Sequence, residues 1–528
     1  MLRGLGVTIV LAVASGGEPV VLLAYAATVA VLQLCWTSFQ RSMSRAIATR
    51  PAMAVRNIGQ ELELRTFYAR ARRRAANAPS VLHVTDLAVV AGMALALATP
   101  QPGLVAVLVA VVGAVAMVGF AAFARRWSDR FRASGRVERY ERQLQAQLEA
   151  FDPQVIVHVS AGTSQTYMFN QWMDAFNAVP QRLLFLVREA THLSRLGATH
   201  WPVIYATRTR DVERFVLPNV RIAFYAANGG KNVHLLREAG VKHVFLNHGD
   251  SDKSSSANPV TRVYNELWVA GPAAVDRYEA AGIDIPRSSF AIVGRPQVDG
   301  MTAGLRRSGQ PPRVLYAPTW EGAYEESNYS SLEVMGVEIV RRIIAERPDW
   351  GIVFKPHPAT GKQRSGILRA KREVEALLRD APNAERHLLA GPARMSVYDC
   401  FHETDVLISD ISSVVTDFLV TDRPVLVSNP KGLPVDEYLR LFPSQRASYL
   451  VDAACESLLP MLDLALGDDP LAAERRAMRA YLHGEHPHGP LQTFRDHITR
   501  LYDRAEADAR AHRSYFKFAD HTVASASG

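Results

Sequence analysis

The stretch DVLISDISSVVTDF, residues 405–418, combines a short apolar run, a polar turn and the first residues of a helix. The β-branched run 406–409 is typical of a buried strand, and Ser412 and Ser413 stand where the next helix should begin. Backbone N–H groups at a helix start, the helix dipole and two hydroxyls together favour an anion. Helix capping would explain one serine but not both, so the stretch predicts a phosphate-binding turn at a strand end.

Similar apolar runs recur on both sides of this stretch, each followed by a helical pattern, which indicates parallel sheets. The first group lies at residues 155–159, 182–187, 203–206, 221–225, 243–246, 267–270 and 290–293. The second group lies at 314–317, 352–355, 406–409 and 425–427, with helices such as 334–345 and 371–379 between them. A linker rich in Gly and Pro, residues 300–312, separates the groups. We therefore predict an α/β protein with two Rossmann-like domains that face a cleft.

The first quarter of the chain is much more apolar than the rest. Residues 81–98 and 104–124 are apolar runs of roughly 18 to 21 residues, long enough for helices that cross about 30 Å of hydrocarbon. Only Thr-Pro-Gln-Pro-Gly separates them, which is typical of a hairpin tip. Residues 20–37 form a third run and residues 5–14 a shorter one. These patterns predict an α-helical transmembrane region with four helices in two hairpins.

Arginines decide the expected orientation of this region. They flank the apolar runs at Arg3, Arg41, Arg45, Arg50, Arg56, Arg65, Arg70, Arg72, Arg73, Arg74, Arg125, Arg126, Arg130 and Arg132. The two hairpin tips carry no Lys or Arg, so the positive-inside rule places the arginine-rich segments and the long C-terminal part in the cytoplasm. A rival interpretation takes residues 1–14 as a secretory signal, and the nature of residues 1–19 stays open.

Length and charge narrow the classes of function. The chain has 528 residues, more than one hydrophobic core usually organises, and a formal net charge of +8. Because the basic residues lie beside the apolar runs, we expect a membrane partner and no nucleic acid. Cys35, Cys400 and Cys455 have the spacing of neither a disulfide framework nor a zinc site. No tightly bound cofactor or metal is predicted.

The predicted domain organisation follows from these patterns. It comprises a membrane region at 1–127, a linker helix at 128–150, one Rossmann-like domain at 151–304, a second at 305–470, and C-terminal helices with a disordered tail at 471–528. The helical stretch 471–510 is expected to cross back and brace the two domains.

Polar residues directly after predicted strands are the candidate site residues, because parallel sheets bind ligands at the carboxyl ends of their strands. After the run 243–246, His248 could accept a proton from an attacking hydroxyl, Gly249 allows close backbone approach, and Lys253 could neutralise a phosphate. The simpler alternative is a polar turn in which Asp250 and its neighbours cap the next helix.

The second predicted sheet supplies three further clusters. Thr319 and Trp320 follow the run 314–316, although proline and tryptophan there could simply serve packing. In the sequence KPHP, two prolines extend the backbone so that Lys355 and His357 could contact a diphosphate. The remaining candidates are the two carboxylates of the opening stretch, Asp410 and Asp417.

One other group of histidines, His483, His486 and His488, has the density of a metal site. Gly484, Pro487 and Gly489 make it a loop, and no matching carboxylate or cysteine spacing accompanies it. We favour an incidental polar loop over a metal site.

Taken in order, the clusters resemble the CDP-glycerol glycerophosphotransferase family, the teichoic acid polymerases and primases of bacterial cell walls. The resemblance rests on HGDSDK at 248–253, GRPQVD at 294–299, YAPTW at 316–320, His357-Pro358 and DISSVVTD at 410–417. The first departs from the family pattern at Asp250 to Asp252, the second has Gln297 in place of the family arginine, and the last has Ile411 in place of tyrosine. Coverage is roughly 241–430, without the apolar first quarter.

The resemblance implies a GT-B-type fold and attack of an acceptor hydroxyl on the β-phosphorus of a CDP-linked polyol, which releases CMP. It implies His248 and His357 as catalytic residues, with Gly249, Asp250 and Lys253 on the acceptor side in domain 151–304. On the donor side it implies Arg295, which precedes the second domain, and, within domain 305–470, Thr319, Trp320, Lys355, Asp410, Ser412, Ser413 and Asp417. A divalent cation with the donor diphosphate, the polyol, the acceptor and the oligomeric state are left open.

The resulting prediction is a multi-pass protein of the bacterial plasma membrane with cytoplasmic catalytic domains. It would transfer glycerol phosphate or a related polyol phosphate to a lipid-linked or polymeric acceptor. Two alternatives stay open: a GT-B glycosyltransferase that uses a UDP- or GDP-sugar, and a non-catalytic scaffold for wall-polymer assembly. Polar groups at the strand ends argue against the scaffold, which would not need them.

Overall fold

A computed structural model describes residues 19–20, 23–24, 26–31, 34–35, 37–38, 54–58, 91–92, 94–95, 98–133, 136–206, 208–301, 309–322, 324–391 and 395–526. The chain divides into two compact units, Met1–Phe151 and Asp152–Gly528, which are described separately.

The first unit contains the strand β1 (Ala54–Arg56) and the helices α4 (Pro102–Ala133) and α5 (Arg136–Phe151). Within α4, the segment Pro102–Phe123 has a mean hydropathy of 2.8 and is only 11% buried, so it is long and apolar enough to cross a membrane. It is the one such helix among the described residues. The predicted span 104–124 lies within α4, and the described residues of the predicted span 20–37 are helical. The spans 5–14 and 81–98 fall wholly or largely outside the described residues.

The second unit begins with a parallel sheet, which defines the first domain. Its strands are β2 (Val155–Val159), β3 (Leu183–Val187), β4 (Val203–Tyr205), β5 (Ile222–Tyr225), β6 (Lys242–Phe245), β7 (Glu266–Val269) and β8 (Phe290–Ile292). They lie in the order β4-β3-β2-β5-β6-β7-β8, and each neighbouring pair is parallel. The central strands are buried on both faces, as expected for a sheet covered by helices on both sides.

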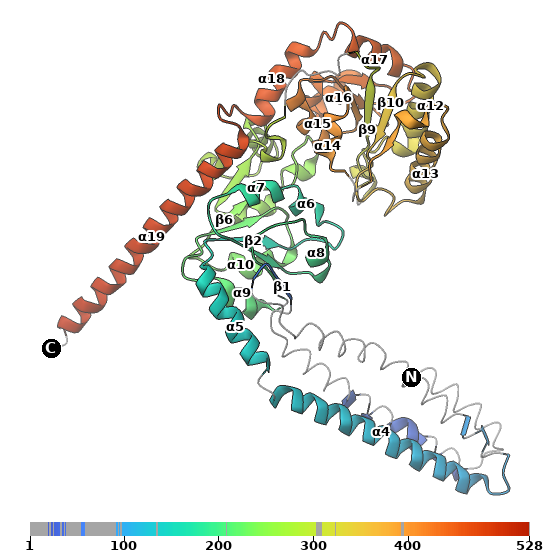
Figure 1. The fold of residues 1–528 in the computed structure, drawn as a ribbon, viewed down its shortest axis with the longest axis vertical. Coiled ribbons are helices and arrows are strands. Elements are labelled where there is room, and N and C mark those ends of the chain that lie inside the picture. The colour runs from blue at the N-terminus through green and yellow to red at the C-terminus, as the bar shows by residue number, and fades with distance from the viewer. Residues whose placement is uncertain are drawn as a thin grey trace. The chain divides into compact units, whose positions relative to one another are not determined.

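Short helices connect these strands. They are α6 (Tyr167–Asn170), α7 (Met173–Ala178), α8 (Ala190–Arg195), α9 (Thr209–Phe215), α10 (Val233–Leu236) and α11 (Pro272–Ala280). Single turns of 3₁₀-helix occur at Gly230–Asn232, Ser254–Ser256, Pro259–Val263, Arg287–Ser289 and Pro296–Val298. Figure 1 shows these elements grouped around one sheet, in which β5 is the central strand, between β2 and β6.

A second parallel sheet defines the second domain. Its strands are β9 (Arg313–Ala317), β10 (Gly351–Phe354), β11 (Leu388–Leu389), β12 (Val406–Ser409), β13 (Val425–Ser428) and β14 (Tyr449–Val451). They lie in the order β11-β10-β9-β12-β13-β14. Every strand predicted from the sequence is present, and the sequence analysis missed only the short edge strands β11 and β14 of this sheet.

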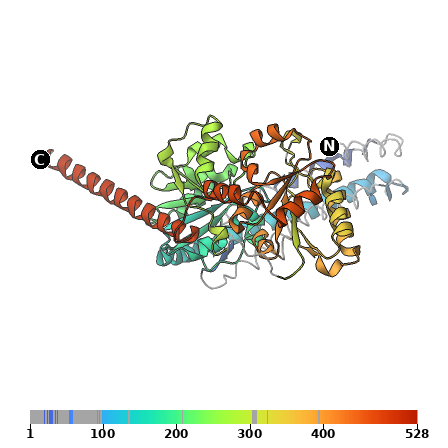
Figure 2. The same cartoon turned by 90° about the horizontal axis from the view of Figure 1, so that it is seen from above.

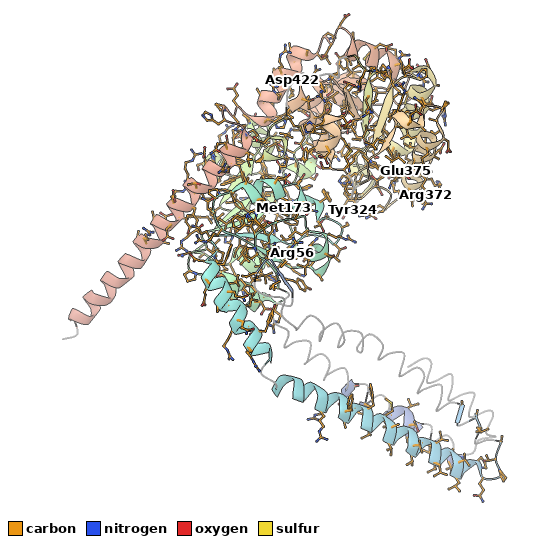
Figure 3. All side chains as sticks on the ribbon, in the orientation of Figure 1. Arg56, Met173, Tyr324, Arg372, Glu375 and Asp422 are labelled. Carbon is orange, nitrogen blue, oxygen red and sulfur yellow. The ribbon has the colours of Figure 1, made fainter. Side chains whose placement is uncertain are left out.

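The helices of the second domain are α12 (Val337–Glu346), α13 (Ser365–Asp380), α14 (Val397–His402), α15 (Ser413–Phe418), α16 (Val435–Leu441) and α17 (Leu458–Leu466). A π-turn precedes α12 at Leu332–Gly336, and 3₁₀ turns occur at Glu325–Ser327, Ala384–Arg386, Leu419–Thr421 and Pro443–Ala447. Residues of β9, β10, α12 and α13 share one buried core. Arg372 and Glu375, labelled in Figure 3, mark the outer side of α13.

Two C-terminal helices, α18 (Ala472–His483) and α19 (Pro490–Ala526), connect the two domains. Leu482 of α18 belongs to a core of the second domain, whereas Phe494 and Ile498 of α19 belong to the core of the first. The expectation that this stretch crosses back is therefore confirmed. The far end of α19 extends away from both sheets in the two views (Figures 1 and 2).

Candidate functional site

Two predicted catalytic histidines, one from each domain, both contact the ring of one tyrosine. His248 follows β6 of the first domain and His357 follows β10 of the second. The ring of Tyr167, in α6, lies edge-on to both, with centroid distances of 6.1 Å to His248 and 5.2 Å to His357. The loops at the carboxyl ends of the two sheets therefore meet here. Sequence analysis did not single out Tyr167, because it lies in no recognisable motif.

The ring of His357 has a defined protonation state. Its Nδ1 accepts a hydrogen bond from the backbone N–H of Ala359 at 3.1 Å, so the neutral ring carries its proton on Nε2. Burial, and then the positive charge of Lys253, lower the pKa of His357 from 6.5 to about 3. The indole of Trp320 stacks on the ring at 6.1 Å. His357 is therefore held as a neutral hydrogen-bond donor.

The backbone around His248 is fixed by its neighbours. Asn247 has a left-handed φ of 57°, and its Oδ1 accepts from the N–H of His248 at 2.8 Å. The Trp172 indole donates to the carbonyl of Asn247 at 2.9 Å, and Gln171 donates to the carbonyl of His248. Burial, followed by Arg295 and Lys253, lowers the pKa of His248 to about 4. The ring is thus neutral at pH 7, as a general base must be.

Lys253 joins the two domains beside these histidines. Its Nζ donates to the hydroxyl of Thr319 at 2.8 Å and lies 5.6 Å from the ring centroid of Tyr329. Burial lowers the pKa of Lys253 to about 8, while the charge of Asp410 acts in the opposite direction. The structure therefore brings together Lys253 and Thr319, two residues predicted from separate motifs.

The predicted serine pair lies where the domains touch. Ser412 precedes α15 and Ser413 begins it, and the Ser412 side chain makes no capping hydrogen bond to this helix start. A Cβ placed on Gly249 would lie 2.6 Å from the hydroxyl oxygen of Ser413, so only glycine permits this approach. The Ser412 hydroxyl is 3.2 Å from that of Ser409. The helix start thus contacts the loop that carries His248.

Asp410, predicted to bind the donor, has its carboxylate surrounded by protein groups. Its oxygens accept from the backbone N–H of Thr319 at 2.7 Å, from the N–H of Ser331 at 3.1 Å and from the Ser428 hydroxyl. The side chain is fully buried, and this burial raises its pKa. Asp410 therefore connects the ends of three strands or loops and holds Thr319 in place.

Arg295 and Asp417, both predicted on the donor side, bind each other. The guanidinium makes two hydrogen bonds to the carboxylate, at 2.9 Å from Nε and 2.8 Å from the terminal nitrogen. Both side chains are about 95% buried, and the Tyr398 hydroxyl donates to the same carboxylate at 3.1 Å. Because Arg295 belongs to the first domain and Asp417 to the second, this is a buried ion pair between domains.

The other predicted charged residues are also paired. The Lys355 ammonium faces the carbonyl oxygens of Gly391 and Met395. In the segment that departs from the family pattern, Asp250 is 2.7 Å and Asp252 3.0 Å from the guanidinium of Arg277 in α11. Asp252 also accepts from the N–H of Ser444 in the second domain at 2.8 Å. The two extra carboxylates are thus balanced by Arg277 instead of facing an open site.

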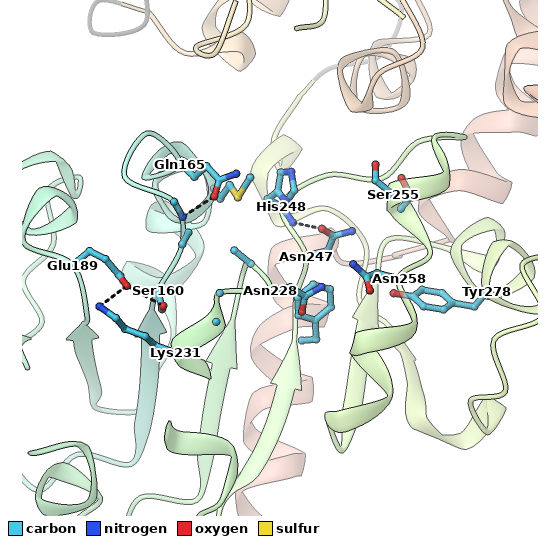
Figure 4. A pocket seen from close by; sticks show the side chains of 18 residues that line it. Ser160, Gln165, Glu189, Asn228, Lys231, Asn247, His248, Ser255, Asn258 and Tyr278 are labelled. Carbon is cyan, nitrogen blue, oxygen red and sulfur yellow. Dashed lines mark hydrogen bonds and ion pairs between the residues drawn. The ribbon is translucent and has the colours of Figure 1, made fainter. Parts of the chain in front are cut away.

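A pocket of about 540 Å³ opens beside His248 at the carboxyl end of the first sheet (Figure 4). The loops after β2, β3, β5 and β6 line it, with Ser160, Glu189, Asn228, Lys231 and Asn247 among its polar side chains. The sequence analysis did not identify this pocket. Its residues are single polar positions that follow separate strands, and no spacing in the sequence connects them.

The loop that carries His483, His486 and His488 connects α18 to α19. His483 Nε2 is 2.7 Å from the carbonyl of Thr416, and the two ring nitrogens of His486 contact the His483 carbonyl at 2.7 Å and the Thr493 hydroxyl at 3.1 Å. The loop also packs against Gly294, where an added Cβ would lie 2.5 Å from His486 Nε2. Within the part of the chain that the structure describes, no cluster of three or more His, Cys, Asp or Glu could hold a metal.

Comparison with known proteins adds one family match. Residues 297–432 match the family model described as CDP-Glycerol:Poly(glycerophosphate) glycerophosphotransferase. The predicted resemblance is thereby confirmed over residues 297–432, and with it the predicted class of enzyme, a transferase of this type. The HGDSDK segment that carries His248 lies outside the matched range. No curated protein matches the sequence.

Solved structures with a similar arrangement of elements are distant. The wall teichoic acid polymerase TagF has 12% identity over 73% of this chain and 98% of its own, with a TM-score of 0.44. The MnaA–UDP structure from S. aureus has 13% identity over 63% of this chain and 93% of its own, with a TM-score of 0.42. A putative UDP-N-acetylglucosamine 2-epimerase from Listeria monocytogenes has 12% identity over 68% and 96%, also with a TM-score of 0.42.

Proposed function

We propose that this chain transfers a polyol phosphate, such as glycerol phosphate, from a CDP-linked donor to a lipid-linked or polymeric acceptor at a membrane surface. The observation that carries the proposal is the pairing of His248 and His357 across Tyr167, at the point where the family-matched second domain meets the first. Two neutral imidazoles from opposite domains suit a reaction between two substrates that enter from opposite sides.

The proposed reaction is an in-line displacement at the β-phosphorus of the donor. The acceptor hydroxyl oxygen forms a bond to this phosphorus while the bond to the bridging oxygen of CMP breaks, and CMP leaves with the electron pair. His248, neutral because of its low pKa, accepts the proton of the hydroxyl. Such transfers need positioning and charge stabilisation more than covalent chemistry.

On the donor side, we propose that His357 donates its Nε2–H to a diphosphate oxygen, while Ser412 and Ser413 contact the same group. Lys253, from the first domain, stays on the acceptor side. Asp410, Arg295 and Asp417 then act by holding these residues in position, as their protein partners suggest. This division gives the second domain the nucleotide donor and the first domain the acceptor, which is the GT-B arrangement. A loosely held divalent cation could accompany the diphosphate.

The first unit supports the membrane part of the proposal. The apolar side chains of α4, among them Leu104, Val111 and Val115, are exposed in the protein alone, as expected for a helix that contacts lipid. Exposed Arg125 and Arg126 follow the apolar segment, and arginines in this place favour the cytoplasmic side. We therefore propose a plasma-membrane protein whose catalytic domains face the cytoplasm.

The proposal is tested by measuring CMP release from CDP-glycerol by the full chain in membranes that contain a lipid-linked acceptor. His248→Ala and His357→Ala should each lower the transfer rate by about 10²–10⁴-fold, because a proton acceptor or a phosphate ligand is lost. His402→Ala removes an exposed histidine at the end of α14 and should leave the rate unchanged.

The same assay with UDP- and GDP-sugars separates the proposal from the glycosyltransferase alternative. Release of UDP or GDP in preference to CMP would replace the proposed donor with a nucleotide sugar. Wild-type rates in both histidine variants would overturn the assignment of the site itself.

A further inference from the structure

We propose that the pocket beside His248 binds an uncharged, hydroxyl-rich unit, a sugar or polyol, as the attacking end of the acceptor. This inference rests on the proposed function and names the chemical class of the acceptor. The pocket volume of about 540 Å³ lies within the range of small-ligand sites, about 300–1,000 Å³. Because His248 lines the pocket, a hydroxyl of the bound unit would lie near the proposed base.

Four carboxamide side chains line the pocket with their oxygens already occupied by protein donors. Gln165 accepts from Gly162 N–H at 2.8 Å, Asn247 from His248 N–H at 2.8 Å, Asn258 from Val260 N–H at 2.9 Å and Asn228 from the Tyr264 hydroxyl at 3.2 Å. A backbone N–H can only donate, so the amide orientation of the first three is fixed by chemistry. Tyr264 accepts from Asn232, which leaves its own proton for Asn228.

The NH₂ groups of these four amides therefore remain as donors. In the part of the chain that the structure describes, none of them has a protein acceptor within hydrogen-bonding distance. Figure 4 shows Gln165, Asn228, Asn247 and Asn258 around the same hollow as His248. Neutral NH₂ donors suit hydroxyl and ring oxygens, which are acceptors without charge.

The charges that line the pocket cancel each other. Lys231 and Glu189 are the charged side chains among the lining residues, and the Lys231 ammonium lies 3.1 Å from a Glu189 carboxylate oxygen. The same ammonium donates to the Arg188 carbonyl at 3.1 Å, and the Ser160 hydroxyl donates to Glu189. Lys231 is the one cation among the lining residues, and it is already paired with the Glu189 carboxylate. Burial of a phosphate in this pocket would therefore be unfavourable, because no free cation among these lining residues balances its charge. Sugar hydroxyls carry no such penalty.

Apolar groups complete the pocket. Met168, Phe245 and Tyr278 contribute surface on which the carbon face of a sugar ring can pack. A Cβ on Gly229 would lie 2.2 Å from the Ser160 carbonyl, so the loop after β5 is held tightly against the loop after β2 and the shape is preformed. The phosphates of a lipid-linked acceptor would then lie outside the pocket.

The first experiment measures binding without turnover. Calorimetric titration of the full chain in lipid nanodiscs compares an uncharged disaccharide with the phosphomonoester of the same disaccharide. We expect the uncharged compound to bind at least about tenfold more tightly. Equal or tighter binding of the phosphomonoester would overturn the assignment of the pocket.

The second experiment replaces NH₂ donors by carboxylate oxygens. In the double variant Gln165→Glu with Asn258→Asp, each new carboxylate can still accept the backbone N–H that its amide accepts now, so the fold should be kept. The KM for a glycan-ended acceptor should rise about tenfold or more, while the KM for CDP-glycerol should stay unchanged. Asn328→Asp is the matched control, because Asn328 makes the same kind of bond, to Ser330 N–H, outside the pocket.

The two proposals fail in different ways. An unchanged acceptor KM in the double variant would overturn the pocket assignment, even if CMP release confirmed the reaction. Absence of CDP-glycerol turnover in the wild-type protein would overturn the proposed function, and the titration with the uncharged disaccharide would still decide the chemistry of the pocket.

Discussion

The carboxyl ends of the two sheets differ in how their polar side chains are used. At the second sheet, Asp410 and Asp417 have their oxygens occupied by backbone N–H groups, hydroxyls and Arg295. At the first sheet, the amides that line the pocket keep their NH₂ groups available. The second sheet is thus rich in groups that hold the architecture together, whereas the first presents groups that can meet a ligand.

This difference shows that a residue in a recognisable motif need not be a residue that is available to a ligand. The residues that carry the family resemblance include several whose charges are satisfied within the protein. The residues that can contact a ligand in the first domain belong to no motif. Substitutions that remove a satisfied partner should therefore affect folding first, and substitutions in the pocket should affect binding first.

The largest expected effect is on stability, when Arg295 is removed. Arg295→Ala leaves the Asp417 carboxylate buried without its cation, and breaking such a pair should destabilise the protein by about 3–5 kcal/mol. Thermal unfolding of the purified chain measures this effect. Arg341→Ala, which removes an exposed ion pair with Glu338, is the control and should change stability by less than about 1 kcal/mol.

An unchanged unfolding temperature in Arg295→Ala, together with lost CDP-glycerol binding, would contradict this interpretation. Arg295 would then be a donor ligand, as the resemblance implies, and the contrast between the two sheets would disappear.

Much of the fold could be predicted from the sequence because each strand is a compact apolar run. Examples are the strands at residues 155–159, 314–317 and 406–409. They are buried on both faces, and the apolar composition that this burial requires is visible in the sequence. Strand β11, Leu388–Leu389, was missed because two residues give no pattern. Strand β14, Tyr449–Val451, is little longer and lies at the other edge of the sheet.

The site could be predicted only where a motif marks it. His248, His357 and Lys253 could be named as candidates because they follow strands in recognisable short sequences, and the structure brings all three close together. Tyr167, Gln165 and the other pocket residues were not found, since their proximity arises from folding over long sequence separations. The ion pair between Asp417 and Arg295 could not be predicted either, because the two residues lie in different domains.

The next effect concerns the place where the two sheet ends meet. In Gly249→Ala, the new Cβ would lie 2.6 Å from the Ser413 hydroxyl oxygen, so the two loops must separate. We expect a loss of about 1–3 kcal/mol in stability, the usual effect of overpacking, and a lower transfer rate. Gly240→Ala is the control, because nothing lies within 4 Å of its Cβ position.

The Gly249→Ala variant could instead have the same unfolding temperature as the wild type and the same rate of CDP-glycerol turnover. The two loops could then not be in such close contact. The proposed meeting of donor and acceptor groups at Ser413 would then have to be abandoned.

The smallest effect depends on pH and concerns His158, a buried histidine of the first sheet. His158 lies in β2 with 1% of its surface exposed, and burial lowers its pKa from 6.5 to about 3. Below pH 6.5 the unfolded chain therefore binds a proton that the folded protein does not, so stability falls as the pH decreases toward 3. Between pH 7 and pH 5 this group should contribute a loss of about 2 kcal/mol.

In His158→Asn, that part of the acid sensitivity should disappear. The amide NH₂ can replace the Nδ1–H that faces Asn232 Oδ1 at 3.2 Å, so the variant should match the wild type at pH 7 to within about 1 kcal/mol. Thermal unfolding at pH 7 and pH 5 measures both statements. An equal loss of stability in the two proteins between pH 7 and pH 5 would mean that His158 is protonated in the folded state. Water would then reach the centre of the first sheet in spite of its burial.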